Sequence, residues 1–328
     1  MVLALLCGTA HAQGYEATPV KRAYAYGVND AGVMVGFDPY ADPPSAFAIG
    51  TRHSVKLLGL AGTGVVGFAG SIHEDVIVGQ CMSGNNPVPC SWNGTRTATA
   101  LALPDGYTAG QANRISADGR IAGSANVTLA SALVPVVWTD GVPSILPVPP
   151  GTFQGSAAGT NRLGQVVGNI DQGSGWHAVV WQGDAVTSLP GGEVPGTGTI
   201  AGATNASGTI VGAAVDTATG TTHAVAWQDG SMIRLPELAP GSSYAVDINE
   251  AGDIVGYSGG HGVLWHDGEV IDLDAFLPDA LKRQGYVLDQ ANGISNTGFI
   301  SAEAFRPGES LPVAIRLTPS TAERAGRR

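Results

Sequence analysis

The sequence predicts an all-β protein: a seven-bladed β-propeller of four-stranded antiparallel blades, closed into a ring by its N-terminal strand. Three observations support this prediction. Glycine accounts for 48 of the 328 residues, about twice its usual share, and charged residues are only 13%. Glycine costs about 1 kcal/mol at each helical position, so long helices are disfavoured. The glycines also follow a repeat of 43 to 46 residues, and each repeat contains four strand-like segments.

The first element of each repeat is a turn between two strands. In Thr204–Gly212, Asn205 is followed three residues later by Gly208, and β-branched residues come next. An Asn or Ser side chain caps such a turn, and Gly takes the left-handed conformation without steric cost. β-Branched residues favour the strand that follows. The seven copies of this motif end at residues 36, 79, 123, 168, 212, 256 and 302. The second copy has Asp75 in place of the turn glycine, and the last copy ends in Ala302 instead of glycine.

The second half of each repeat predicts two more strands. One strand ends in Trp, as in Val179–Trp181, and a glycine turn such as Asp229–Gly230 follows the Trp strand. The last strand runs to Leu-Pro, as at Leu189–Pro190, where proline suits the end of an edge strand. Ile49 and Ile315 take the place of Trp in the first and last units. Four short strands in a repeat of this length are typical of a propeller blade.

The two ends of the chain predict how the ring closes. The last unit reaches its third strand at Ile315 and lacks an outer strand, whereas Tyr15–Lys21 precedes the first turn and has no blade of its own. We therefore expect Tyr15–Lys21 to form the outer strand of the last blade, which leaves no large open edge. The propeller is expected to be a single domain over residues 13–317, followed by a disordered basic tail over residues 318–328.

The N-terminus and the cysteines predict an extracellular or periplasmic protein. Residues 1–12 combine the apolar run Val2–Leu6 with a small-residue cleavage site at Ala10–Ala12, which is the pattern of a secretory signal peptide. This segment is short and lacks a basic start, and a buried N-terminal strand is the alternative. Removing the signal peptide leaves Cys81 and Cys90, which we expect to form a disulfide; two free thiols are the alternative.

Charge and motif content disfavour several classes of function. The formal net charge is −11, and the sequence has no basic stripe of the kind that binds nucleic acid. No later segment is long and apolar enough to cross a membrane. No nucleophile elbow, phosphate-binding loop or Cys/His catalytic set is present, so we expect no catalytic residues, metal or cofactor. His177 and His223 occupy equivalent repeat positions and are better explained by structural repetition than by metal binding. We expect a monomer.

The repeated Ile-Asn-x-x-Gly-x-Val-Val-Gly, followed by His-Ala-x-x-Trp, resembles the HAF-repeat family of extracellular repeat proteins. The second half of this pattern stands in the chain as His177–Trp181 and His223–Trp227. The resemblance covers residues 15–317, and units one, two and seven depart from the pattern. It implies a secreted or surface-exposed bacterial protein without catalytic residues.

Candidate binding residues fall into two groups. The long, variable loops share one face of the predicted ring, and the segment Cys81–Cys90 is expected to be one of them. Loops on a rigid scaffold often carry binding sites. The aromatic residues expected on this loop face are Tyr40, Tyr107, Trp176 and Tyr257. Small residues dominate the channel-lining strands, and the polar exceptions expected to face the channel are Asn113, Arg114, Asp247, Asp289 and Asn292. Of these, Asn113, Asp247 and Asn292 are the candidates for binding a channel ligand. The alternative for the channel group is polar side chains bound only to water.

Two functional hypotheses follow from these groups. The first is a secreted, non-catalytic binding scaffold that takes a protein or glycan partner on the loop face. The alternative is a hydrolase or lyase that acts at the channel mouth, with or without a metal ion, through the channel residues. A structural surface element is a third hypothesis, which binding screens would distinguish from the first.

Overall fold

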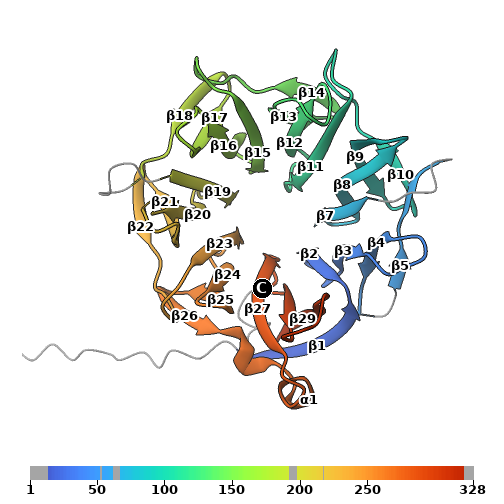
Figure 1. Ribbon diagram of the computed structural model, residues 1–328, viewed down its shortest axis with the longest axis vertical. Helices are drawn as coiled ribbons and strands as arrows, with labels where there is room; N and C mark the ends of the chain where they lie inside the picture. The colour runs from blue at the N-terminus through green and yellow to red at the C-terminus, as the bar shows by residue number, and fades with distance from the viewer. Residues whose placement is uncertain (1–13, 52–53, 62–66, 192–197, 217, 321–328) are drawn as a thin grey trace, which may run out of the picture.

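A computed structural model describes residues 14–51, 54–61, 67–191, 198–216 and 218–320. Seven sheets, which we number as blades I to VII, surround one central axis and confirm the predicted seven-bladed β-propeller (Figure 1). Blades I to VI follow the order of the chain, and each runs as an antiparallel meander from the axis outward. The predicted signal peptide lies outside the described residues.

In the first four blades, successive strands lie progressively farther from the axis. Blade I contains β2 (Tyr24–Val28), β3 (Met34–Asp38), β4 (Ser45–Ile49) and β5 (Ser54–Lys56). Blade II contains β7 (Phe68–His73), β8 (Val76–Ser83), β9 (Asn86–Asn93) and β10 (Thr97–Ala100). Blade III contains β11 (Ala109–Ile115), β12 (Ile121–Asn126), β13 (Val134–Thr139) and β14 (Val142–Ile145). Blade IV contains β15 (Gln154–Thr160), β16 (Gln165–Asp171), β17 (Trp176–Gln182) and β18 (Ala185–Ser188).

The remaining blades follow the same plan, with one exchange at the closure. Blade V contains β19 (Gly198–Thr204), β20 (Ile210–Val215), β21 (Thr222–Gln228) and β22 (Ser231–Arg234). Blade VI contains β23 (Ser243–Ile248), β24 (Ile254–Ser258), β25 (His261–His266) and β26 (Glu269–Asp272). Blade VII contains β27 (Val287–Ile294), β28 (Ile300–Phe305), β29 (Val313–Pro319) and, as its outer strand, β1 (Tyr15–Arg22).

The turn asparagines cap their own turns as predicted and also join neighbouring blades. Asn205 Oδ1 accepts hydrogen bonds from the N–H groups of Ser207 and Thr209, while Gly208 takes a left-handed φ of +82°. Asn205 Nδ2 donates to the carbonyl of Asn249, the equivalent residue of the next blade, at 3.1 Å. The same contact between blades is made by Asn29 to Glu74, Asn161 to Asn205, and Asn249 to Ser295.

In the first six blades the glycine that closes the turn motif is required by close backbone contact. Every inner strand contains a register irregularity, as between Ala201 and Ala203. A Cβ atom on Gly212 would lie 1.9 Å from the Ile200 carbonyl oxygen, which is closer than any real contact. The glycine of β16 shows the same clash, and a Cβ there would also meet the ring of Trp181 at 3.0 Å.

The repeat tryptophans are buried between blades. Trp181 is 1% exposed, and its indole N–H donates to the carbonyl of Pro147 in blade III at 2.6 Å. The Leu-Pro motif that follows β14, β18 and β22 therefore provides the acceptor for the tryptophan of the following blade. The equivalent bonds join Trp227 to Pro190, Trp265 to Pro236 and Trp138 to Ala102.

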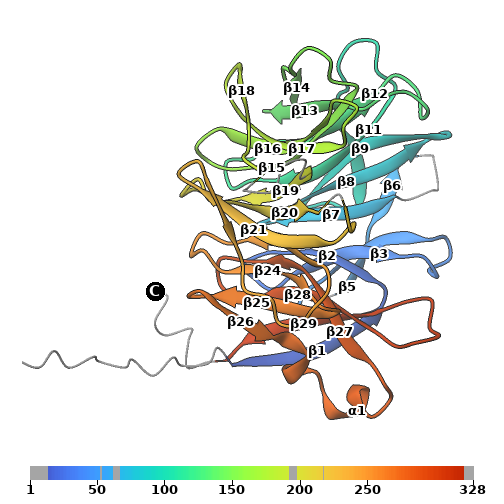
Figure 2. The same ribbon diagram turned by 60° about the vertical axis from the view of Figure 1, so that its left-hand side comes forward.

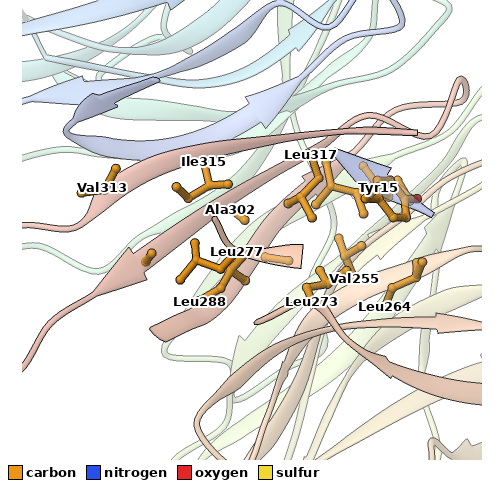
Figure 3. Packing of buried hydrophobic residues seen from close by; sticks show 14 of the residues in the cluster. Tyr15, Val255, Leu264, Leu273, Leu277, Leu288, Ala302, Val313, Ile315 and Leu317 are labelled. Atoms are coloured by element: carbon orange, nitrogen blue, oxygen red, sulfur yellow. The ribbon is translucent and has the colours of Figure 1, made fainter. Parts of the chain in front are cut away.

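The N-terminal strand closes the ring, as predicted. β1 pairs antiparallel with β29 from Tyr15–Pro319 to Arg22–Val313 (Figures 1 and 2). Tyr15 enters the largest apolar cluster, beside Leu317 and Leu273, and its ring meets that of Phe276 edge-on at 5.6 Å (Figure 3).

Several details differ from the expectation. β29 extends to Pro319, two residues into the expected tail, because Thr318 and Pro319 pair with β1; residues 321–328 lie outside the described part. The segment between the two cysteines forms mostly β8 and β9 rather than a long loop. A short strand β6 (Leu58–Leu60) pairs parallel with β10. The short helices η1 (Leu273–Phe276) and α1 (Asp279–Lys282) connect blades VI and VII (Figure 1).

Tyr15→Ala tests the closure. We expect it to lower the free energy of unfolding by about 3 kcal/mol, the usual cost of truncating a buried aromatic side chain. The matched control is Tyr40→Ala, because Tyr40 is 71% exposed and should change stability little. Chemical denaturation of both variants measures the difference, and equal stabilities would show that β1 does not hold the ring closed.

Replacing Asn205 tests the contact between blades. Asn205→Ser keeps a cap for the turn but loses the bond to Asn249, so we expect a loss of about 1 kcal/mol. Asn205→Ala loses both roles and should cost about 2–3 kcal/mol, because buried polar groups are left unpaired. The exposed Asn93→Ser serves as a control in the same denaturation experiment. If Asn205→Ser is as stable as the wild type, the hydrogen bond between blades contributes nothing to the free energy of unfolding.

Candidate functional site

The axial channel is crossed by an ion pair between two charged residues of the inner strands. Arg114 in blade III donates through Nη1 to Asp247 Oδ1 in blade VI. The carboxylate also accepts the backbone N–H groups of Ile248 at 2.9 Å and Ile294 at 3.0 Å. Asp247 thus holds blades III, VI and VII together, and the sequence had indicated both charged residues as channel-facing without indicating that they pair.

The other two channel candidates are bound to protein groups rather than to water alone. Asn113 Nδ2 donates to the carbonyl of Ala157 at 2.8 Å, and Asn292 Nδ2 donates to the carbonyl of Ala25 at the same distance. Each asparagine therefore bridges its own blade to the next one. Asn292 lies near Asp247 along the channel, whereas Asn113 points into the blade III–IV junction.

A cavity of about 140 Å³ lies where the channel opens toward the turns between inner strands. We call it the turn-face cavity. The pair Arg114–Asp247 lines its inner end, and Asn292 also contributes to its wall. Its rim is formed by the first residues of the turns, including Asp30, Arg162 and Glu250. The cavity lies on the face opposite the long loops, where the sequence had not indicated a binding site apart from the channel itself.

A buried acid, Glu303, and a half-buried acid, Asp289, lie close together beside the ring closure. Glu303 in β28 is 5% exposed and accepts the Ala25 N–H of blade I at 2.9 Å. Burial raises the pKa of Glu303 to about 8, and the nearby Asp289 carboxylate adds to this rise. Burial also raises the pKa of Asp289 to about 6. Asp289 Oδ1 is buried without a hydrogen-bond partner in the described structure.

The four aromatic candidates are distributed around the ring and do not converge. Tyr40 in the β3–β4 loop is exposed, and its hydroxyl lies 3.1 Å from Ser310 Oγ. Tyr107 packs against the blade III core, and Tyr257 stacks on Tyr244 with ring centroids 6.3 Å apart. Trp176 begins β17 and is half-buried. Whether these residues bind a ligand stays a prediction.

The two repeat histidines have separate local partners. His177 Nε2 lies 3.0 Å from Ser174 Oγ, and His223 Nδ1 lies 2.7 Å from Glu237 Oε1. In the part of the chain that the structure describes, no three His, Cys, Asp or Glu side chains are grouped as metal ligands. The predicted disulfide is present: Cys81 and Cys90 are joined across β8 and β9. No helix among the described elements has the length and apolar character needed to cross a membrane.

The ring of seven blades, its closure by β1 and its central channel together define a seven-bladed β-propeller. No protein-family model matches the chain, and no curated protein matches it. Among solved structures, the β-propeller domain of the Trilobed protease from Pyrococcus furiosus is similar, with a TM-score of 0.55 and 13% identity over 77% of this chain and 82% of that chain.

Two further solved structures share the fold. YCF48 bound to D1 peptide has a TM-score of 0.55 and 13% identity, with 94% of this chain and 97% of that chain covered. Pyrococcus horikoshii acylaminoacyl peptidase has a TM-score of 0.50 and 11% identity, and 87% of this chain spans only 51% of the peptidase chain. At these identities the likeness shows the fold alone, and enzymes and a peptide-bound protein both occur among these neighbours.

Glu303→Gln tests the electrostatics of the closure. A carboxyl group whose pKa is raised by folding stabilises the protein below its unfolded pKa of about 4.5 and loses this contribution as the pH rises through about 8. The melting temperature of the wild type should therefore fall between pH 5 and about 8.5. Gln keeps an acceptor for the Ala25 N–H without a charge. At about pH 8.5 the variant should therefore melt at least about 2–4 °C above the wild type. The exposed Glu269→Gln should retain the wild-type pH profile, and an unchanged profile for Glu303→Gln would contradict this assignment.

Proposed function

We propose that this protein is a secreted or surface-exposed, non-catalytic scaffold that binds a protein partner on its long-loop face. The proposal includes membership among the HAF-repeat proteins, which the repeated turn and His-Ala-x-x-Trp motifs support. The disulfide between Cys81 and Cys90 supports folding in an oxidising compartment. Extracellular and periplasmic locations both satisfy this condition.

The observation that carries the binding proposal is a group of exposed apolar side chains on the loop face. We call this group the apolar loop patch; its residues are Val127, Leu129, Val148 and Phe153, which are 48%, 61%, 39% and 68% exposed. Val127 and Leu129 lie in the β12–β13 loop, and the other two lie in the β14–β15 connection. The N–H of Gly155, at the start of β15, donates to the carbonyl of Leu133, the last residue of the β12–β13 loop, so the ends of the two segments meet there.

Exposed apolar side chains on neighbouring loops are characteristic of protein interaction surfaces. Polar sugars alone would gain little from the aliphatic Val127 and Leu129, which favours a protein over a glycan. The channel residues proposed for the enzymatic alternative are occupied by contacts between blades. Asp247 already accepts three hydrogen bonds, and the Asn113 and Asn292 amides each donate to a carbonyl of the next blade.

Paired variants test this proposal. The double variant Leu129→Ser and Phe153→Ser removes the most exposed part of the apolar loop patch. Leu163→Ser is the matched control, because Leu163 is 56% exposed but lies in a turn on the opposite face. We expect a partner captured from the secreted and cell-surface fractions to bind wild type and Leu163→Ser equally and the double variant at least about tenfold more weakly. Equal capture by all three proteins would contradict the proposal.

A further inference from the structure

The turn-face cavity carries opposite charges on opposite sides of the axis. Its lining on the side of blades II to IV includes the cationic side chains of Arg114 and Arg162 and the imidazole of His73. Its lining on the side of blades VI, VII and I includes Asp247, Glu250 and Asp30. We call these two groups the basic arc and the acidic arc. Glu74 and Asp75 belong to the blade II turn but do not line the cavity.

The innermost charges depart from the repeat. Arg114 and Asp247 stand at the same repeat position, immediately after the irregularity in the inner strand. The other five blades have only small residues at this position, namely Gly27, Ser71, Gly159, Ala203 and Gly293. Packing of the inner strands around the axis therefore requires no charged residue at this position. Arg114 and Asp247 depart from the repeat, and their side chains make the inner end of the cavity polar.

The rim of the cavity retains unused binding capacity. Within the described residues, neither the Arg162 side chain nor the His73 side chain forms a hydrogen bond or an ion pair, although both residues line the cavity. On the acidic arc, Asp30 accepts the Asn296 N–H at 2.7 Å, and Glu250 accepts the Ala206 N–H at 3.0 Å. Each of these carboxylates holds further acceptor sites that one backbone bond does not fill.

We propose that the turn-face cavity binds a small zwitterion, an α-amino acid, with its carboxylate toward the basic arc and its ammonium toward the acidic arc. A charge leaves water at a large cost unless it meets an opposite charge, and this cavity offers one of each sign. A ligand with a single charge would gain from one arc and be repelled by the other. The volume of about 140 Å³ suits a ligand of amino-acid size. This site lies on the face opposite the apolar loop patch and does not depend on the function proposed there.

Isothermal titration calorimetry of the full chain against each of the twenty common L-amino acids tests the proposal. We expect at least one of them to bind with saturation. For the tightest one, the amine that lacks the carboxylate and the acid that lacks the amino group should each bind about tenfold or more weakly, because each loses one charge-assisted set of hydrogen bonds. Absence of binding by all twenty at millimolar concentrations would overturn the proposal, and so would an acid or amine that binds as tightly as the amino acid.

Two rim variants assign the orientation. Arg162→Gln should weaken binding of the amino acid and the acid analogue but should not weaken the amine analogue, which the basic arc repels. Glu250→Gln should weaken binding of the amino acid and the amine analogue but should not weaken the acid analogue, which the acidic arc repels. Leu163→Ser, in the same turn as Arg162 but outside the cavity lining, is the control and should keep wild-type affinity. If both rim variants also bind as the wild type does, the arcs do not recognise the ligand and the proposal fails.

Discussion

In four of the seven blades an asparagine side chain stands at the start of the inner turn, and its hydrogen bonds are the interaction on which this ring depends most. Its Oδ1 fixes its own turn, and its Nδ2 donates to the backbone of the following blade, as Asn161 does to Asn205 and Asn205 to Asn249. One residue therefore couples local turn geometry to the angle between neighbouring blades. In the bonds made by Asn161, Asn205 and Asn249, donor and acceptor occupy the same position in successive units.

Two blade junctions show what happens where the asparagine is replaced. Ser116 and Ser295 keep the turn but have no amide to reach the next blade. At the junction of blades VII and I other bonds take over: the Asn296 N–H donates to Asp30, and Ser301 donates to the Tyr26 carbonyl. Ring closure thus combines a pairing of strands, through β1, with polar bonds near the axis. The buried Glu303 belongs to the same junction and makes it sensitive to pH.

The sequence predicted most of the fold because the fold is repetitive. Turn glycines, tryptophans and the strand missing from the last unit were sufficient to predict seven blades and the closing role of Tyr15–Lys21. The donation by Asn205 to the next blade was not visible, because it depends on the angle between blades rather than on any local pattern. The helical connection at Leu273–Phe276 was missed for a related reason, since tertiary burial of Leu273 stabilises a segment too short to show a helical period.

The site was less predictable than the fold. Arg114 and Asp247 were visible as polar exceptions in the channel, but their pairing across the axis requires the closed ring. A comparison of the seven units at this one position would have singled them out, because the other five residues there are small. The aromatic candidates were chosen by loop position alone, and burial of Tyr107 against the core shows why that criterion is weak.

Hydrogen exchange under native conditions tests the central claim, that bonds between blades make the ring one cooperative unit. We predict that inner-strand amides of blades IV to VI exchange with the same opening free energy as those of β1 and β29. Blades that open separately, with blade V exchanging fully while its neighbours stay protected, would contradict this claim. Such a result would mean that each blade is stabilised independently and that the turn asparagines serve only their own turns.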